Sequence, residues 1–171
     1  MWPAGIYKCW RHGRGFGVHS PYAYRMVREV LNLPRGYVYY AYGEIVRCIS
    51  REKASLDVRE ALLIFRLLLA MKPATVALKC DDAAVRHVLA RVVAAACPQA
   101  AVTDRGEMLI CMGRADAGAL KPRYAYFSDS RHPALASVMS GMTAGHVYRN
   151  RHRAVVAAEP YLPLQTFDIA F

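Results

Sequence analysis

A short apolar segment followed directly by a capped helix is the feature that most restricts the fold of this chain. Residues 74–79, Ala-Thr-Val-Ala-Leu-Lys, have the length and composition of a buried strand. Asp81 and Asp82 then offer side chains that cap a helix, and residues 83–96 carry a long helical pattern that ends before Pro98. The sequence therefore predicts a strand, a turn and a helix, the unit of α/β sheets.

Other apolar segments extend this pattern in both directions. Helices are predicted at residues 21–32, 42–51, 57–71 and 133–142, and further short strands at residues 100–103, 108–112, 124–128, 146–150, 154–158 and 166–171. The central strands are short and apolar, which is expected where helices cover both faces of a sheet. The economical interpretation is an α/β sheet with an antiparallel hairpin at its C-terminal end.

The length of 171 residues suits one ordinary domain. We expect residues 1–72 to form an N-terminal helical segment packed on the sheet, and residues 73–171 to form the sheet core. No internal repeat, low-complexity tract or linker divides the sequence, so the two parts are expected to make one compact domain.

The cysteines and the hydropathy favour a cytoplasmic protein without a membrane partner. Five cysteines are widely spaced and include no C-x-x-C pair, which fits reduced thiols. The N-terminus lacks the apolar core of a secretory signal. The most apolar stretch, residues 61–71, is about half the ~20 residues that cross a bilayer, and Arg66 interrupts it.

The chain is basic, with a formal net charge of +10 from 23 Lys and Arg against 13 Asp and Glu. Residues 1–59 hold ten of the basic side chains and four of the acidic ones. Such a balance attracts phosphate backbones, because bound cations release condensed counterions. A solvated surface is the alternative interpretation.

Residues 11–19 form a glycine-punctuated segment in which His12 and His19 flank three glycines. Glycine loops can cradle phosphate groups, and on that ground His19 is a candidate pocket residue. The alternative is that the glycines provide turns while the histidines pack or cap, because this segment follows no predicted strand.

Three stretches of the sequence together resemble a known family. They are RHGRGFGVHSPY at residues 11–22, ALLIFRLLLAMKPATVAL at residues 61–78, and YFSDSRH at residues 126–132 with the closing TFDIAF at 166–171. This set is similar to segments of a bacterial family of class I S-adenosylmethionine-dependent methyltransferase-like proteins. The chain is shorter than a usual member, and the missing part falls between residues 97 and 124.

The resemblance implies a Rossmann-like, mostly parallel sheet with flanking helices, an N-terminal helical extension and an antiparallel C-terminal hairpin, truncated relative to the usual methyltransferase fold. It also implies S-adenosylmethionine as cofactor, bound where glycines let the first strand turn into its helix. In this chain the turn holds Lys79, Asp81 and Asp82 and has no glycine. We expect these side chains to fill the space for the methionine moiety, and therefore expect no bound cofactor.

Three further residues occupy positions where related proteins place ligands. Asp104 follows the predicted second strand, where an acid would accept hydrogen bonds from a ribose; a simple turn is the alternative. Asp129 and His132 follow the strand that resembles a metal-binding motif, but one carboxylate is too few for a hard cation. The sequence instead predicts a loop cap at Asp129, a helix entrance at His132, and no metal site.

Three functions stay open. The first is a non-catalytic interaction or regulatory module with a degenerate cofactor site, acting on a protein or small-molecule partner. The second is an active S-adenosylmethionine-dependent methyltransferase with an altered cofactor loop. The third is a nucleic-acid binder that uses the basic N-terminal third and its tyrosines at 37, 39, 40 and 42. The altered turn favours the first, and fold resemblance alone does not establish chemistry.

Any binding to nucleic acid is expected to be weak, salt-sensitive and independent of sequence, because arginine contacts to phosphate carry no base information. Substituting Arg11, Arg14, Arg25 and Arg28 together should abolish it in a fluorescence-anisotropy titration with single- and double-stranded oligonucleotides. Tight binding that persists at high salt would contradict this interpretation.

Overall fold

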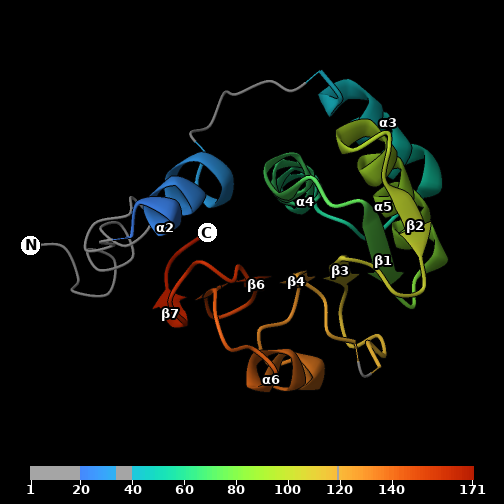
Figure 1. Cartoon of the computed structure of the whole chain (residues 1–171). Coiled ribbons are helices and arrows are strands. Elements are labelled where there is room, and N and C mark those ends of the chain that lie inside the picture. Colours follow the sequence, from blue (N-terminus) through green and yellow to red (C-terminus); the bar gives the residue numbers. More distant parts are fainter. Residues whose placement is uncertain (1–19, 34–39, 119) are drawn as a thin grey trace, which may run out of the picture.

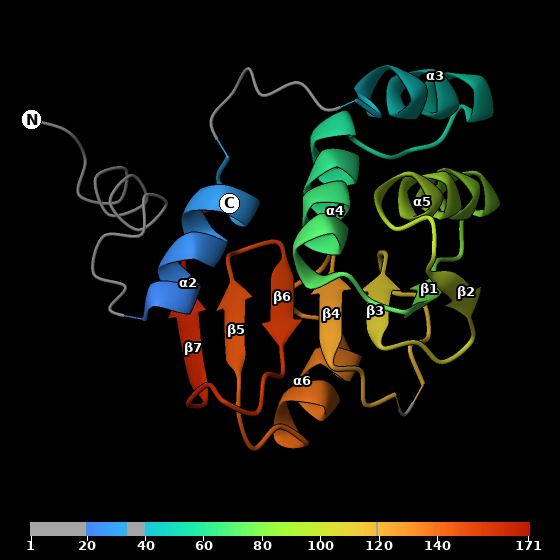
Figure 2. The same ribbon diagram turned by 45° about the horizontal axis from the view of Figure 1, so that its top comes forward.

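The computed structural model describes residues 20–33, 40–118 and 120–171 of the chain. They form a mixed α/β fold built on one open, seven-stranded sheet in the order β2-β1-β3-β4-β6-β5-β7 (Figures 1 and 2). The strands are β1 (Thr75–Lys79), β2 (Ala101–Thr103), β3 (Met108–Cys111), β4 (Tyr124–Phe127), β5 (His146–Arg149), β6 (Ala154–Ala157) and β7 (Gln165–Asp168). The helices are α2 (Pro21–Arg25), η1 (Met26–Leu31), α3 (Tyr42–Glu52), α4 (Val58–Met71), α5 (Ala83–Ala96) and α6 (Pro133–Ser140).

Most neighbouring strands of the sheet are parallel. Strands β2, β1, β3 and β4 run in one direction, and β6 is antiparallel to both β4 and β5. Strands β5 and β6 thus form the predicted antiparallel hairpin. Strand β7 does not pair as a further antiparallel strand of this hairpin. Residues 158–164 lead the chain back, so that β7 pairs in parallel with β5 at the outer edge of the sheet.

The helices cover the two faces of the sheet unequally (Figure 2). One face of the sheet is covered by α2, η1, α4 and α5, and α3 packs on the outside of this layer. Among the described elements, α6 is the helix that covers the other face. All three residues of β2 are exposed, because this short strand lies at the sheet edge. No helix in the described ranges has the length and apolar character needed to cross a membrane.

The predicted helix starts are confirmed by their caps. Ser20 accepts a hydrogen bond from the Ala23 amide at the start of α2, and Asp57 accepts one from the Arg59 amide at the start of α4. The predicted helix at 21–32 is not uniform, because it widens to a π-helical segment at η1. There the Asn32 amide bonds the Val27 carbonyl five residues back.

Strand β1 is buried on both faces of the sheet. Val76, Ala77 and Leu78 are buried, with 0–2% of their surface exposed. Val76 and Leu78 pack in the cluster under α4 and α5, and Ala77 packs in the cluster under α6. This alternation is expected of a strand that is covered on both faces.

His146, the first residue of β5, is a buried titratable group inside this core. Its ring lies among those of Tyr22 and Phe167, and its Nδ1 atom is 3.0 Å from the Tyr148 hydroxyl. Its Nε2 atom has no hydrogen-bond partner among the described residues. Burial lowers the pKa of His146, because the charged ring would lose its hydration.

We predict that His146 makes the fold sensitive to acid. The unfolded chain takes up a proton on this residue below its ordinary pKa of about 6.5, whereas the folded chain does not, so stability is full above that pH and falls below it. Between pH 6.5 and the lowered pKa of the folded state, His146 should reduce the free energy of unfolding by up to about 1.4 kcal/mol for each pH unit of acidification. The variant His146→Gln should lack this pH dependence. Urea unfolding of both chains at pH 8.0 and 5.5 measures the difference, and equal pH dependence would refute the assignment.

Candidate functional site

A hollow of about 520 Å³ lies where β1, β3 and β4 end. Residues 80–82 line it after β1, residues 112–114 after β3, and Ser128 after β4. Ser55 contributes from the loop before α4, Glu60 from the first turn of α4, and the turn before β6 contributes His152 and Arg153. The hollow therefore sits at the carboxyl edge of the parallel strands.

The strand order places this hollow at a reversal of the chain. From β1 the chain crosses to β2 on one side, whereas β3 pairs with β1 on the other side. The helices that follow such strands diverge, and ligands of open α/β sheets bind in the resulting crevice. The volume also lies within the range of about 300–1,000 Å³ that is typical of small-molecule pockets.

Asp82 closes the start of α5 with its own side chain. Its Oδ1 atom accepts hydrogen bonds from the amides of Ala84 and Val85 at 2.8 and 3.1 Å. Its Oδ2 atom accepts one from the Ser55 hydroxyl at 3.1 Å. The hydrogen bonds from Val85 and then Ser55 lower the pKa of Asp82, so the carboxylate is ionised at neutral pH. Two of the helix donors that would face an anionic ligand are therefore already bound.

Cys80, between β1 and this cap, is not an activated nucleophile. Its Sγ atom is 3.3 Å from the Asp82 carbonyl oxygen, to which the thiol donates. Burial raises the pKa of Cys80, and the charges of Asp82 and Asp81 act in the same direction. The thiol form therefore dominates at neutral pH, and the thiolate is the form that attacks.

A second polar group forms the α4 side of the hollow. The Tyr126 hydroxyl donates to Glu60 Oε1 at 2.6 Å, and Arg153 Nε lies 3.8 Å from the same oxygen. Burial first, and then the charge of Glu60, hold the pKa of Tyr126 well above its ordinary value. The phenol therefore stays protonated and serves as a hydrogen-bond donor to Glu60, with Arg153 as the nearby cation.

The charges in the lining are separated along the sheet edge. Asp81 and Asp82 lie beside β1, whereas Arg114 follows β3 and Arg153 precedes β6. Asp81 and Arg114 are exposed to solvent. A ligand with separate positive and negative groups matches this arrangement better than a uniformly anionic one.

Two of the residues that the sequence suggested for the site line the hollow, namely Asp81 and Asp82. The expectation that side chains fill this space is wrong. Asp82 folds back onto the amides of α5 and Asp81 points to solvent, so the turn leaves the hollow open.

The other described candidates lie outside this lining. Lys79 ends β1, and its carbonyl oxygen accepts the Met112 amide. Asp104 is exposed beyond the edge strand β2, beside Thr103, whose hydroxyl donates to the Arg105 carbonyl. The arrangement fits the turn interpretation of Asp104.

Asp129 and His132 have the structural roles that were given as alternatives. Asp129 accepts the Arg131 amide at 2.9 Å, which confirms the loop cap. His132 caps α6 by accepting the Ala134 amide through Nδ1, and its Nε2 atom lies 3.0 Å from the Ala115 carbonyl. His132 is buried beside α6 and does not line the hollow. His19 falls outside the described residues.

Sequence reasoning missed the residues that complete the hollow from the α4 and β6 sides. His152 and Arg153 lie in the turn between β5 and β6, where the Asn150 amide donates to the Arg153 carbonyl at 3.0 Å. The same turn also borders the hollow. Glu60 and Arg153 lie far apart in the sequence, and only the folded structure brings the start of α4 close to β6.

Comparison of the chain with models of protein families, with curated proteins and with solved structures found no match.

The Asp82 cap predicts unequal effects of two neighbouring substitutions. Asp82→Ala should lower the thermal unfolding midpoint, because two α5 amides and the Ser55 hydroxyl lose their acceptor. Asp81→Ala removes an equal charge that is exposed and caps no amide, and it should leave the midpoint nearly unchanged. Differential scanning calorimetry at pH 7 measures both midpoints. Equal midpoints for the two variants would show that the Asp82 cap does not stabilise the fold.

Proposed function

We propose that this chain is a methyltransferase-like regulatory module that binds a small ligand in the carboxyl-edge hollow and catalyses little or no methyl transfer. The observation that carries the proposal is the turn between β1 and α5. It borders an open hollow, as a ligand site would, yet the Ala84 and Val85 amides at the start of α5 are bound by Asp82.

The sheet supports the methyltransferase-like, Rossmann-like part of the proposal. A central parallel group, β2-β1-β3-β4, is followed by an antiparallel strand, β6, inserted beside β4. This arrangement agrees with the parallel sheet and C-terminal hairpin that the family resemblance implies. The hollow lies at the chain reversal beside β1, where that resemblance would place a cofactor.

The chemistry of the turn argues against tight binding of S-adenosylmethionine. A bound cofactor carboxylate would need free amide donors, but those of Ala84 and Val85 are held by Asp82 at 2.8 and 3.1 Å. It would also approach the two carboxylates of Asp81 and Asp82. Placing like charges together without a cation is unfavourable.

The second candidate is an active methyltransferase with an altered cofactor loop. The openness of the hollow favours it, since the side chains after β1 leave about 520 Å³ unfilled. In that case Glu60, Tyr126 and Arg153 would supply polar groups near the substrate. The affinity for the cofactor separates the two candidates.

Titration with S-adenosylmethionine and S-adenosylhomocysteine tests the proposal. We expect dissociation constants weaker than about 1 mM, equivalent to about −4 kcal/mol, because the amides of Ala84 and Val85 are already bound to Asp82. Isothermal titration calorimetry gives the constants, with thermal shift as the second readout.

A micromolar constant for either compound, about −8 kcal/mol, would instead establish the enzyme candidate. Arg153→Ala serves as the matched variant, because it removes a lining cation. If a micromolar signal appears and this variant does not alter it, the ligand binds outside the hollow and both candidates lose their site.

A further inference from the structure

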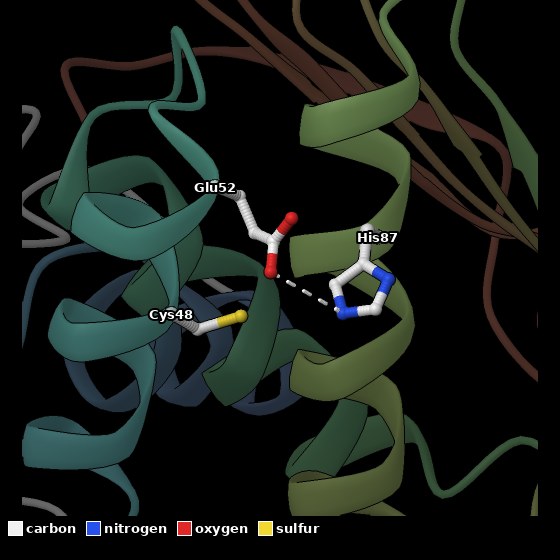
Figure 3. Close-up of side chains that lie close together, drawn as sticks. All are labelled: Cys48, Glu52 and His87. Atoms are coloured by element: carbon white, nitrogen blue, oxygen red, sulfur yellow. Dashed lines mark ion pairs between the residues drawn. The ribbon is translucent and has the colours of Figure 1, made fainter.

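A group of three possible metal ligands lies away from the hollow, between α3 and α5 (Figure 3). Cys48 and Glu52 project from α3, and His87 projects toward them from α5. One ligand atom from each residue, a sulfur, a carboxylate oxygen and an imidazole nitrogen, lies within 4.8 Å of the other two.

The local fold explains why these three side chains meet. Cys48 and Glu52 are four residues apart in one helix, so they lie on the same face, one turn apart. Helices α3 and α5 pack side by side, which brings His87 against that face. Cys48 is buried, whereas the His87 side chain is 53% exposed, so the group is closed on the core side and open to solvent on the other.

The donor set indicates the class of ion. A thiolate, an imidazole and a carboxylate are ligands of Zn²⁺ and similar first-row divalent ions, whereas Ca²⁺ and Mg²⁺ require oxygen ligands. Ligand bonds of about 2.0–2.3 Å in a tetrahedron place donor atoms roughly 3.3–3.8 Å apart. His87 Nε2 and Glu52 Oε1 are 3.8 Å apart, so this pair needs little movement.

The neighbouring charge does not prevent such a site. Arg51 Nε lies 3.0 Å from Glu52 Oε1, but the Arg51 side chain is 69% exposed. Exposed ion pairs of this kind contribute little to stability, so a metal ion can displace the contact at small cost.

We propose that Cys48, Glu52 and His87 bind a Zn²⁺-class divalent ion with water as the fourth ligand. The ion joins α3 to α5. Binding therefore stabilises the packing of these two helices. The sequence alone predicted no metal site, because these ligands span two helices and follow no ligand motif.

The test uses the full-length, reduced protein and the metal ion alone. Titration with Co²⁺ should give one bound ion per chain with a thiolate-to-cobalt charge-transfer band, and Zn²⁺ should displace it. We expect His87→Gln, at an exposed position that does not disturb the core, to weaken Co²⁺ and Zn²⁺ binding by at least about tenfold. Cys48→Ser should abolish the charge-transfer band.

Matched controls place the site on these residues. Cys80→Ser, Cys97→Ser and His152→Gln alter described cysteines and an exposed histidine outside the group, and should bind Co²⁺ as the parent does; Cys9→Ser tests the cysteine of the N-terminal segment. The parent chain should also gain thermal stability with Zn²⁺, and His87→Gln should not. Absence of a thiolate band, parent-like affinity in His87→Gln, or loss of the band in any control would overturn the proposal.

Discussion

Strand β1 is hydrogen-bonded in parallel to β2 along one edge and to β3 along the other, and its central residues are buried on both faces. This double pairing determines where the chain can go next. The helix after β1 must begin at the carboxyl edge, and the chain must cross in different directions to reach β2 and β3. The hollow at that edge is therefore a consequence of the strand order, and its lining is supplied by whatever residues follow the buried strands.

The chemical character of the hollow depends mainly on Asp82. At this position in an α/β fold, a free helix N-terminus presents amide donors to an anionic ligand. Here the Asp82 carboxylate accepts two of those donors and a hydroxyl, which stabilises α5 and leaves acidic charge beside β1. The same residue thus accounts for the stable turn, the open space in front of it, and the expected loss of affinity for an anionic group.

Local signals in the sequence predicted most elements of this fold. The caps at Ser20 and Asp57, the apolar run of β1 and the long pattern of α5 each depend on residues close in sequence. Features that depend on tertiary context were not predictable, such as the π-helical segment η1, the exposure of β2 and the parallel pairing of β7. The candidate sites follow the same division. Asp81 and Asp82 were found from their place after a strand, whereas the contacts of Glu60 with Tyr126 and of Glu52 with His87 require the packed structure.

Asp82 holds two of the helix donors at the hollow through its own carboxylate. The most direct measurement follows the backbone amides of Ala84 and Val85 in ¹H–¹⁵N NMR spectra while S-adenosylhomocysteine is added up to millimolar concentration. Both resonances should stay in place, since their protons are held by Asp82. Saturable shifts of these two amides, together with that of Gly113 across the hollow, would instead show that the ligand carboxylate displaces Asp82 from the start of α5.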